Sequence, residues 1–524
     1  MPGFSFTDNL GAITDFGLHF HPDEPALLQQ GRTLTYRELD DRINRVACGL
    51  LDAGVGSGDR VLILWENDIR FVEATLGTIR AGAVAVPVNP NLTEATHRMH
   101  LNDSGAIAVL CGATAADHAA HFADDDQVVL AVAADSTHAN VVEHEAWLSS
   151  APARRPEMSA DPGDLAWLPY TSGTTGTPKG VKLAHQMLLR DAQLLSQNCY
   201  LNSSDRVVLA APLFHMNAAA CGILPMLLVG GSVYVLPSFE AATVLRTFSE
   251  QRATYSLGVP AMFKLMLAQD DSELSRDFST LRLICCGSAP MPPSLINRLT
   301  EIFPNARFVE GYGLTECGPA ATMNPLIGPR RNGSIGRPLP GFEARIVDYD
   351  GNEVTAGNTG ELWLRSPLCT TLGYLGRPDE DARKRKPDGW FATGDLAMCD
   401  DDGWLYFRGR ADDRMNVGGE NVYPAEVEAI LTRHPQVRDV AVVALPHDTK
   451  GQVPVAFVVR EAGSDLDESS LREFFFTEGP AYAHPRRIHF LDSLPLSPTG
   501  KTDRRSLIRQ AHDSTPADIS GGTQ

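Results

Sequence analysis

The stretch YTSGTTGTPKG, residues 170–180, is dense in hydroxyl side chains and glycines and ends in a lysine followed by a glycine. Glycines let backbone N–H groups approach an anion, and hydroxyl groups add further donors. The apolar run before it, residues 165–169, is typical of a buried strand. The stretch therefore predicts a phosphate-binding loop after a strand, although such a turn taken alone is more often a plain surface loop. It differs from a Walker A loop, because Lys179 stands between Pro178 and Gly180.

Outward from this loop, short apolar runs alternate with helical patterns. Thr35 and Glu38 predict a capping box at the start of a helix whose apolar residues share one face. Strand-like runs occupy residues 61–65, 83–87, 206–210, 231–236, 254–257, 281–286 and 307–309. This alternation predicts an α/β fold of parallel and mixed sheets flanked by helices, with ligands bound at the carboxyl ends of the strands.

The pattern of apolar and polar residues changes after about residue 340. Short alternating segments at 344–347 and 361–364 predict antiparallel sheet or a distorted β-barrel. Beyond residue 410 a compact α+β pattern begins, with a helix at 424–433 and strands at 440–444 and 453–459. We expect a large N-terminal domain over residues 1–410, a small C-terminal domain over 411–511 and a disordered tail over 512–524.

Composition narrows the partners and the compartment. A net charge of −20 argues against non-specific binding to nucleic acid or an anionic membrane. The N-terminus has no signal-peptide pattern, and no run of about 20 apolar residues predicts a membrane span. Nine scattered cysteines without a CxxC pair favour reduced thiols and a cytoplasmic location. A monomer and a homodimer both stay open.

Seven further segments match, in order and spacing, the motifs of one known family. With the opening loop they support a resemblance that spans residues 30–510. They are residues 212–215 (PLFH), 287–290 (GSAP), 311–316 (GYGLTE), 393–395 (TGD), 409–413 (GRADD), 418–426 (GGEN and PAE) and 498–501 (PTGK). The chain resembles the adenylate-forming superfamily, which includes acyl-CoA synthetases, adenylation domains of peptide synthetases and luciferases. The resemblance implies that a carboxylic acid attacks the α-phosphate of ATP, that pyrophosphate leaves, and that a thiol or amine then displaces AMP. Such chemistry needs charge neutralisation more than a protein nucleophile.

The resemblance also implies roles for individual residues. The β- and γ-phosphates would be held by Thr171, Ser172, Gly173, Thr174, Thr175, Gly176 and Lys179. Adenine would lie among Gly287, Ser288, Ala289, Glu310, Gly311, Tyr312 and Gly313. Thr315 would bind the α-phosphate and Glu316 would hold Mg²⁺, a hard cation that prefers oxygen ligands. Asp395 would accept hydrogen bonds from the ribose hydroxyls, and Arg410 would reach the ribose or a phosphate.

Four implied roles concern catalysis and domain motion. Lys501 would bridge the substrate carboxylate and the α-phosphate, where a lone lysine would otherwise be read as a solvated surface residue. His215 resembles the family histidine beside the acyl carboxylate, although a single histidine after an apolar segment is usually structural. Asp412 would be the hinge about which the small domain rotates, the alternative being a simple turn cap. Gly418 and Gly419 would line the pantetheine passage, because glycines permit close approach.

The substrate and the acceptor are less narrowly defined. Amino-acid-activating relatives carry an acidic residue where this chain has His215, so a fatty or aromatic organic acid fits better. CoA is the expected acceptor, giving an acyl-CoA thioester. Lys450 stands where some relatives have tryptophan against pantetheine, and His484 where many have lysine, so an amine or a carrier protein stays an alternative acceptor. A non-catalytic nucleotide-binding paralogue is a remote alternative, opposed by the presence of Lys501, Glu316 and Asp395.

Overall fold

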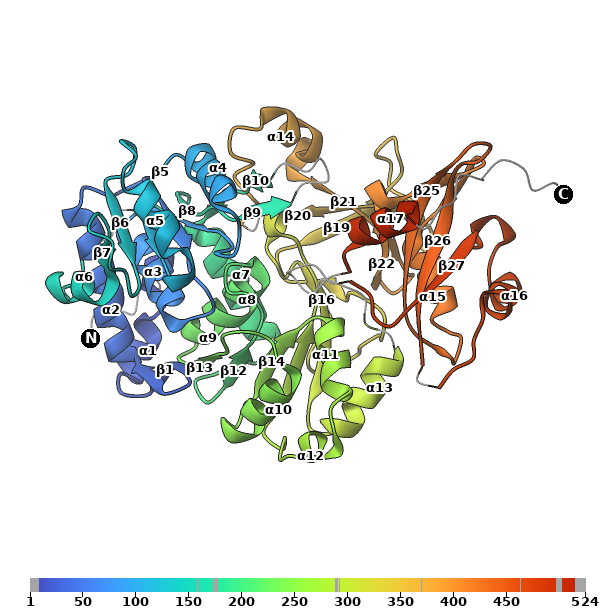
Figure 1. Cartoon of the computed structure of the whole chain (residues 1–524), viewed down its shortest axis with the longest axis horizontal. Helices are drawn as coiled ribbons and strands as arrows, with labels where there is room; N and C mark the ends of the chain where they lie inside the picture. Colours follow the sequence, from blue (N-terminus) through green and yellow to red (C-terminus); the bar gives the residue numbers. More distant parts are fainter. Residues whose placement is uncertain are drawn as a thin grey trace. The chain divides into compact units, whose positions relative to one another are not determined.

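The computed structural model describes residues 9–157, 160–172, 178–287, 291, 293–368, 370–461, 463–495 and 502–513 (Figure 1). The chain forms two compact units. The first comprises Met1–Ala344 and Leu364–Ala392, and the second comprises Arg345–Trp363 and Thr393–Gln524. The boundary expected after residue 410 stays a prediction.

The larger sheet of the first unit has nine strands in the order β18-β17-β16-β15-β14-β12-β13-β1-β2. Its six central strands, from β16 to β1, are mutually parallel, and antiparallel strands close both edges. The strands are β1 (Pro25–Gln29), β2 (Arg32–Thr35), β12 (Arg206–Leu209), β13 (Ser232–Val235), β14 (Tyr255–Gly258), β15 (Leu283–Cys286), β16 (Arg307–Tyr312), β17 (Thr322–Met323) and β18 (Arg337–Pro338). The parallel arrangement expected from the sequence is confirmed.

A second sheet of the first unit has the order β11-β8-β4-β3-β5-β6-β7 and is parallel except at β11. Its strands are β3 (Arg60–Leu64), β4 (Val84–Pro87), β5 (Ala106–Cys111), β6 (Leu130–Ala133), β7 (Val142–Glu143), β8 (Leu165–Trp167) and β11 (Leu183–Ala184). Every residue of β4 is buried, and so are four of the five residues of β3. That burial explains why these strands read as continuous apolar runs in the sequence.

Helices cover both sheets. Their bounds are α1 (Asp15–Phe20), α2 (Tyr36–Asp52), α3 (Ile69–Arg80), α4 (Glu94–Ser104), α5 (Ala116–Phe122), α6 (His144–Ser150), α7 (His185–Asn198), α8 (Met216–Ala218), α9 (Leu224–Leu228), α10 (Ala241–Glu250), α11 (Pro260–Leu267), α12 (Asp271–Leu274), α13 (Pro293–Ile302) and α14 (Pro378–Lys384). The expected capping box of α2 is confirmed, with Thr35 accepting from the Glu38 amide and the Glu38 carboxylate accepting from the Thr35 amide at 2.8 Å. In Figure 1, α10, α11 and α13 gather beside β12, β14 and β16, and their apolar faces form one core with that sheet. Among the described helices, none combines the length and the apolar character that crossing a bilayer requires.

The second unit holds most of a four-stranded sheet and a five-stranded sheet covered by helices. The four strands are β19 (Glu343–Val347), β20 (Thr359–Arg365), β21 (Phe391–Cys399) and β22 (Leu405–Arg410). The five-stranded sheet contains β23 (Met415–Val417), β24 (Glu420–Val422), β25 (Val437–His447), β26 (Gly451–Arg460) and β27 (Arg487–Leu491), with helices α15 (Pro424–Leu431), α16 (Glu468–Glu478) and α17 (Arg504–Asp513).

Alternate residues of β25 serve two separate cores. Val440 and Val442 pack in a cluster that includes residues of α15 and α16, whereas Ala441 and Val443 pack against α17. Successive strand residues point to opposite faces, so both faces of this sheet are covered. The apolar run that predicted a strand at 440–444 is explained by this double burial.

Candidate functional site

The phosphate-loop stretch is flanked by a two-stranded hairpin. β9 (Tyr170–Ser172) pairs antiparallel with β10 (Pro178–Gly180), and Thr171 lies opposite Lys179. Gly173, Thr174, Thr175 and Gly176 lie outside the described residues. The pairing fixes both ends of the loop, because two short strands bring its first and last residues together.

Two residues that the sequence analysis did not identify lie beside Lys179: Glu380 pairs with it, and Tyr374 lies between it and Glu316. The Lys179 ammonium lies 2.9 Å from Glu380 Oε1, and both side chains are largely buried, at 13% and 14% exposure. The same ammonium lies 6.0 Å from the centre of the Tyr374 ring. The Tyr374 hydroxyl donates to Glu316 Oε1 at 2.7 Å. Burial would raise the pKa of the Glu380 carboxyl, but the Lys179 ammonium outweighs it and holds that pKa below its usual value.

We expect Glu380→Gln to lower the melting temperature in the absence of nucleotide. Removing one partner of a largely buried ion pair leaves the Lys179 ammonium poorly compensated, at a cost of about 1–3 kcal/mol. Saturating ATP should narrow the gap to the unmodified protein, because phosphate oxygens replace the missing carboxylate. Thermal unfolding with and without ATP measures both effects.

Asp379→Asn is the matched control for that experiment, because Asp379 is exposed and lies beside Glu380 in the first turn of α14. A stability gap that is the same with and without ATP would contradict a link between Glu380 and the phosphate loop.

The adenine-loop segment and the GYG segment meet at one edge of the larger sheet. Cys286, the last residue of β15, pairs with Glu310 of β16, so Gly287 follows beside Gly311. A β-carbon built on Gly287 would lie 3.6 Å from the Gly311 carbonyl oxygen. Thr315 and Glu316 follow in a 3₁₀ turn, Thr315–Cys317. The carboxyl ends of parallel strands thus bring these predicted residues together, while Ser288 and Ala289 lie outside the described residues.

Glu310 is a buried carboxyl with an altered acidity. Burial raises its pKa from 4.5 to about 7, partly offset by hydrogen bonds from the backbone amides of Gly333 and Met291. The Gly333 amide donates to Glu310 Oε2 at 3.1 Å. The carboxyl therefore changes its charge close to neutral pH.

We expect Glu310→Gln to stabilise the protein increasingly as the pH rises from 5 to 7. In this window the unfolded chain releases the Glu310 proton while the native state retains it, so native stability falls as the pH rises. Glutamine mimics the protonated form and removes this dependence, a difference of about 3 kcal/mol that levels off above pH 7. Melting temperatures at successive pH values measure it. The control is Glu301→Gln at an exposed position of α13, and parallel pH profiles for both variants would refute the assigned acidity.

His215 stands at the start of helix α8. It is the N-cap residue, its amide donates to the Pro212 carbonyl at 3.1 Å, and its ring lies 4.5 Å from the ring of Phe214. A π-helix, Ala219–Ile223, continues directly from α8. His215 is thus placed at the entrance of a buried helical segment, as a pocket-lining role requires, and that role stays a prediction.

Asp395 and Arg410 form an ion pair within the second unit. They lie opposite each other on the antiparallel strands β21 and β22, and Arg410 Nη1 lies 3.0 Å from Asp395 Oδ1. Asp395 is 4% exposed, and its amide donates to Thr393 Oγ1 at 3.0 Å. The sheet register therefore orients the two residues that the sequence assigned to the ribose and its neighbourhood.

The hinge and glycine segments follow directly. Asp412 lies in a 3₁₀ turn, Ala411–Asp413, between β22 and β23. Gly418 and Gly419 form the turn of the β23–β24 hairpin with φ values of +64° and +96°. Side chains disfavour positive φ, so this tight turn requires glycine for its backbone alone. The pantetheine role of the two glycines stays a prediction.

Lys501 and residues 514–524 of the expected tail lie outside the described residues. The first two residues of that tail, His512 and Asp513, instead end helix α17. The residues that sequence reasoning missed are Tyr374 and Glu380. In the sequence these residues belong to a Gly373–Tyr374 pair and to the acidic first turn of helix α14. Neither pattern predicts a contact with Lys179 or Glu316.

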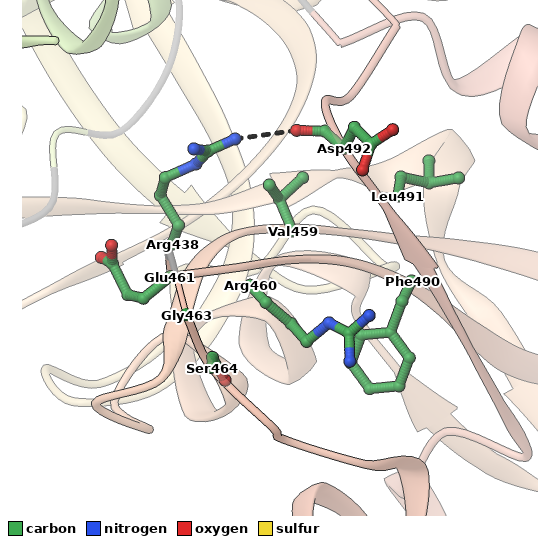
Figure 2. A pocket seen from close by; sticks show the side chains of 9 residues that line it. All are labelled: Arg438, Val459, Arg460, Glu461, Gly463, Ser464, Phe490, Leu491 and Asp492. Atoms are coloured by element: carbon green, nitrogen blue, oxygen red, sulfur yellow. Dashed lines mark hydrogen bonds between the residues drawn. The ribbon is translucent and has the colours of Figure 1, made fainter.

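A cavity of about 310 Å³ lies at the ends of β25, β26 and β27. None of the residues that line it was predicted as a site residue. Figure 2 shows two arginines at its rim. Arg438 donates to the Asp492 carbonyl at 2.8 Å, and the Arg460 guanidinium stacks 4.5 Å from the centre of the Phe490 ring (Figure 2). Both guanidinium groups therefore make contacts within the protein itself.

Comparison with known proteins places these motifs in one family. The AMP-binding enzyme family model matches residues 18–375, and that of the AMP-binding enzyme C-terminal domain matches residues 426–501. The chain is 35% identical over 490 residues to a feruloyl-CoA synthase of Amycolatopsis sp, covering 93% of this chain and 96% of the relative.

Solved structures agree with the sequence comparison. The anthranilate CoA ligase AuaEII in complex with anthranoyl-AMP superimposes with a TM-score of 0.88 at 29% identity, covering 96% of this chain and 97% of the other. The amide bond synthetase McbA of Marinactinospora thermotolerans gives 0.85 at 26% identity, covering 96% and 99%. The chain belongs to the AMP-binding enzyme family and is an acyl-CoA synthetase of the adenylate-forming superfamily.

Proposed function

We propose that the protein activates an aromatic carboxylic acid with ATP and transfers the acyl group to CoA. The observation that carries this proposal is the match over nearly the whole chain to relatives named for aromatic acids, a feruloyl-CoA synthase and an anthranilate CoA ligase. The sequence predicted a fatty or aromatic acid, and of these two classes we propose the aromatic one.

The reaction proceeds in two half-reactions. The acid's carboxylate oxygen bonds to the α-phosphorus of ATP, the bond to the bridging oxygen breaks, and pyrophosphate leaves. The CoA thiol sulfur then bonds to the acyl carbon, its proton goes to solvent, and AMP leaves with the electron pair. Lys179 and the loop donors bind the departing phosphates, Thr315 binds the α-phosphate, and Lys501 holds the two anions together.

Glu316 fits the role of a Mg²⁺ ligand. Tyr374 occupies only its Oε1 oxygen, and the other oxygen takes part in no hydrogen bond among the described residues. A single carboxylate alongside phosphate oxygens is a common environment for Mg²⁺, which would neutralise charge on the phosphates when bound. Tyr374 would orient the carboxylate towards the cation.

An amine acceptor is the second candidate, because the amide bond synthetase is a close structural match. Transfer to a carrier protein and a non-catalytic nucleotide-binding role are retained as weaker alternatives. We also retain a cytoplasmic location, and a homodimer as an assembly to test.

ATP–pyrophosphate exchange with a panel of benzoates, cinnamates, fatty acids and dicarboxylic acids tests the first half-reaction. We expect exchange with the aromatic acids and little with the others. Product mass spectrometry with CoA, amines and a carrier protein offered in parallel then identifies the acceptor. Absence of exchange with every acid would contradict an activating enzyme, and exchange restricted to fatty acids would contradict the aromatic class.

A further inference from the structure

Helix α7 carries an acidic residue in an unusual environment. The Asp191 side chain is completely buried, and neither carboxyl oxygen has a hydrogen-bond partner among the described residues. The Ala320 amide faces the carboxyl group and favours its ionised form, without meeting hydrogen-bond geometry. Leaving a buried polar group unsatisfied costs about 1–3 kcal/mol, so a retained group of this kind calls for an explanation.

Asp191 lies beside the loop that follows Glu316. Gly318 ends the Thr315–Cys317 turn at a φ of +81°, and a β-carbon built on it would lie 2.7 Å from Asp191 Oδ1. Any side chain at position 318 would therefore collide with the carboxyl group. The chain keeps both a glycine and an acidic residue at this contact.

Asp191 also lies close to the π-helix that follows His215 and α8. Its carboxyl contributes to raising the pKa of the buried Cys221 thiol, after burial itself. The carbonyl of Cys221 accepts a hydrogen bond from the Tyr255 hydroxyl at 2.7 Å, which anchors this turn of the π-helix. Helical π-turns are frequent at functional sites.

These two neighbours place Asp191 relative to the substrate. The acid's carboxylate must meet the α-phosphate near Thr315 and His215, and the rest of the acid extends away from them. Two segments continue the chain from these positions: the loop that follows the Thr315–Cys317 turn, and the π-helix that follows His215 and α8. Asp191 Oδ1 lies against Gly318 of the first segment, and helix α7, which carries Asp191, packs against the second. This position puts Asp191 next to the space that the acyl group would enter.

The surroundings favour a neutral partner. Among the described residues no cation pairs with Asp191, and burial raises its pKa well above the usual value. A protonated carboxyl donates one hydrogen bond and accepts another. A hydroxyl group on an aromatic ring can do the same in return, whereas an ammonium group would need an ionised carboxylate.

We propose that Asp191 is a specificity-determining residue of the acyl site, which hydrogen-bonds a hydroxyl substituent on the ring of the aromatic acid. This inference rests on the proposed function, since it concerns the acid that is activated. Its unsatisfied state without substrate is a stability cost that the substrate's hydroxyl removes.

The test is ATP–pyrophosphate exchange with benzoate and cinnamate and with their monohydroxy, monofluoro and aminomethyl derivatives at each ring position. We expect kcat/KM for the best hydroxylated acid to exceed that for its unsubstituted parent about 10- to 100-fold. Asp191→Ala should reduce this ratio to near one, and Asp191→Asn, which still donates and accepts, should retain much of it. Gln197→Ala, at an exposed position of the same helix, should leave the ratio unchanged.

Each other outcome overturns the inference in a recognisable way. An equal loss of kcat/KM for every acid in Asp191→Ala would assign the residue a structural role. A preference for the aminomethyl acids would replace the hydroxyl by a charged partner. An unaltered ratio in Asp191→Ala, with exchange still supported, would refute the inference while sparing the proposed function. Absence of exchange with every acid in the unmodified protein would contradict both the inference and the proposed function. Thermal unfolding of Asp191→Ala, measured beside Asp191→Asn, tests whether a lost ratio arises from misfolding.

Discussion

Replacing Lys501 by alanine is expected to slow formation of the acyl-adenylate by about 100- to 1000-fold. The acid's carboxylate and the α-phosphate repel each other, and a preorganised ammonium between them is worth most at the moment when the new bond forms. ATP–pyrophosphate exchange measures this half-reaction. Thioester formation from supplied acyl-adenylate and CoA measures the other, which should change little because AMP is then the leaving group.

Lys501→Arg serves as the control that keeps the charge, and it should recover part of the exchange rate. Equal losses in both half-reactions would contradict a role for Lys501 restricted to adenylation.

The Asp412→Pro substitution should have the opposite signature. Proline fixes φ near −65° and restricts the preceding residue, so a turn that acts as a hinge, as we propose for Asp412, would lose one of its two conformations. A cost of about 3 kcal/mol for the disfavoured conformation corresponds to roughly a hundredfold in rate. We expect exchange to persist and thioester formation from supplied acyl-adenylate to fall by that factor.

Asp412→Ala keeps the backbone free and should preserve both half-reactions. If it impairs thioester formation as strongly as proline does, the side chain of Asp412 matters and rotation at this position does not.

The fold was largely predictable because its signals are local. The apolar runs that form β12, β15 and β25 are buried by neighbouring strands and helices, so their apolar composition predicts strands at these positions. The capping box of Thr35 and Glu38 is likewise contained within four consecutive residues. Gly287 and Gly311 were predicted together because both belong to motifs of the family that the chain resembles. In the structure Gly287 follows β15, and Gly311 lies in the adjacent parallel strand β16.

The contacts between distant residues were not predictable. Lys179 and Glu380 are 201 positions apart in the chain, and no pattern in either segment encodes their pairing. Asp191 could have been noticed. Asp191 follows Leu188 by three residues and precedes Leu195 by four, so all three side chains lie on the same, buried face of the helix. Polarity alone suggests a solvent-facing residue, and only tertiary packing reveals that it is enclosed.

The pairing of Lys179 with Glu380 has a kinetic consequence if Lys179 binds the β- and γ-phosphates, as we propose. The ammonium already has a carboxylate partner in the absence of nucleotide, so ATP would gain from Lys179 only the difference between two partners. Pyrophosphate would then also be held less tightly, and competition from Glu380 for the cation would shorten the lifetime of the product complex and favour repeated turnover.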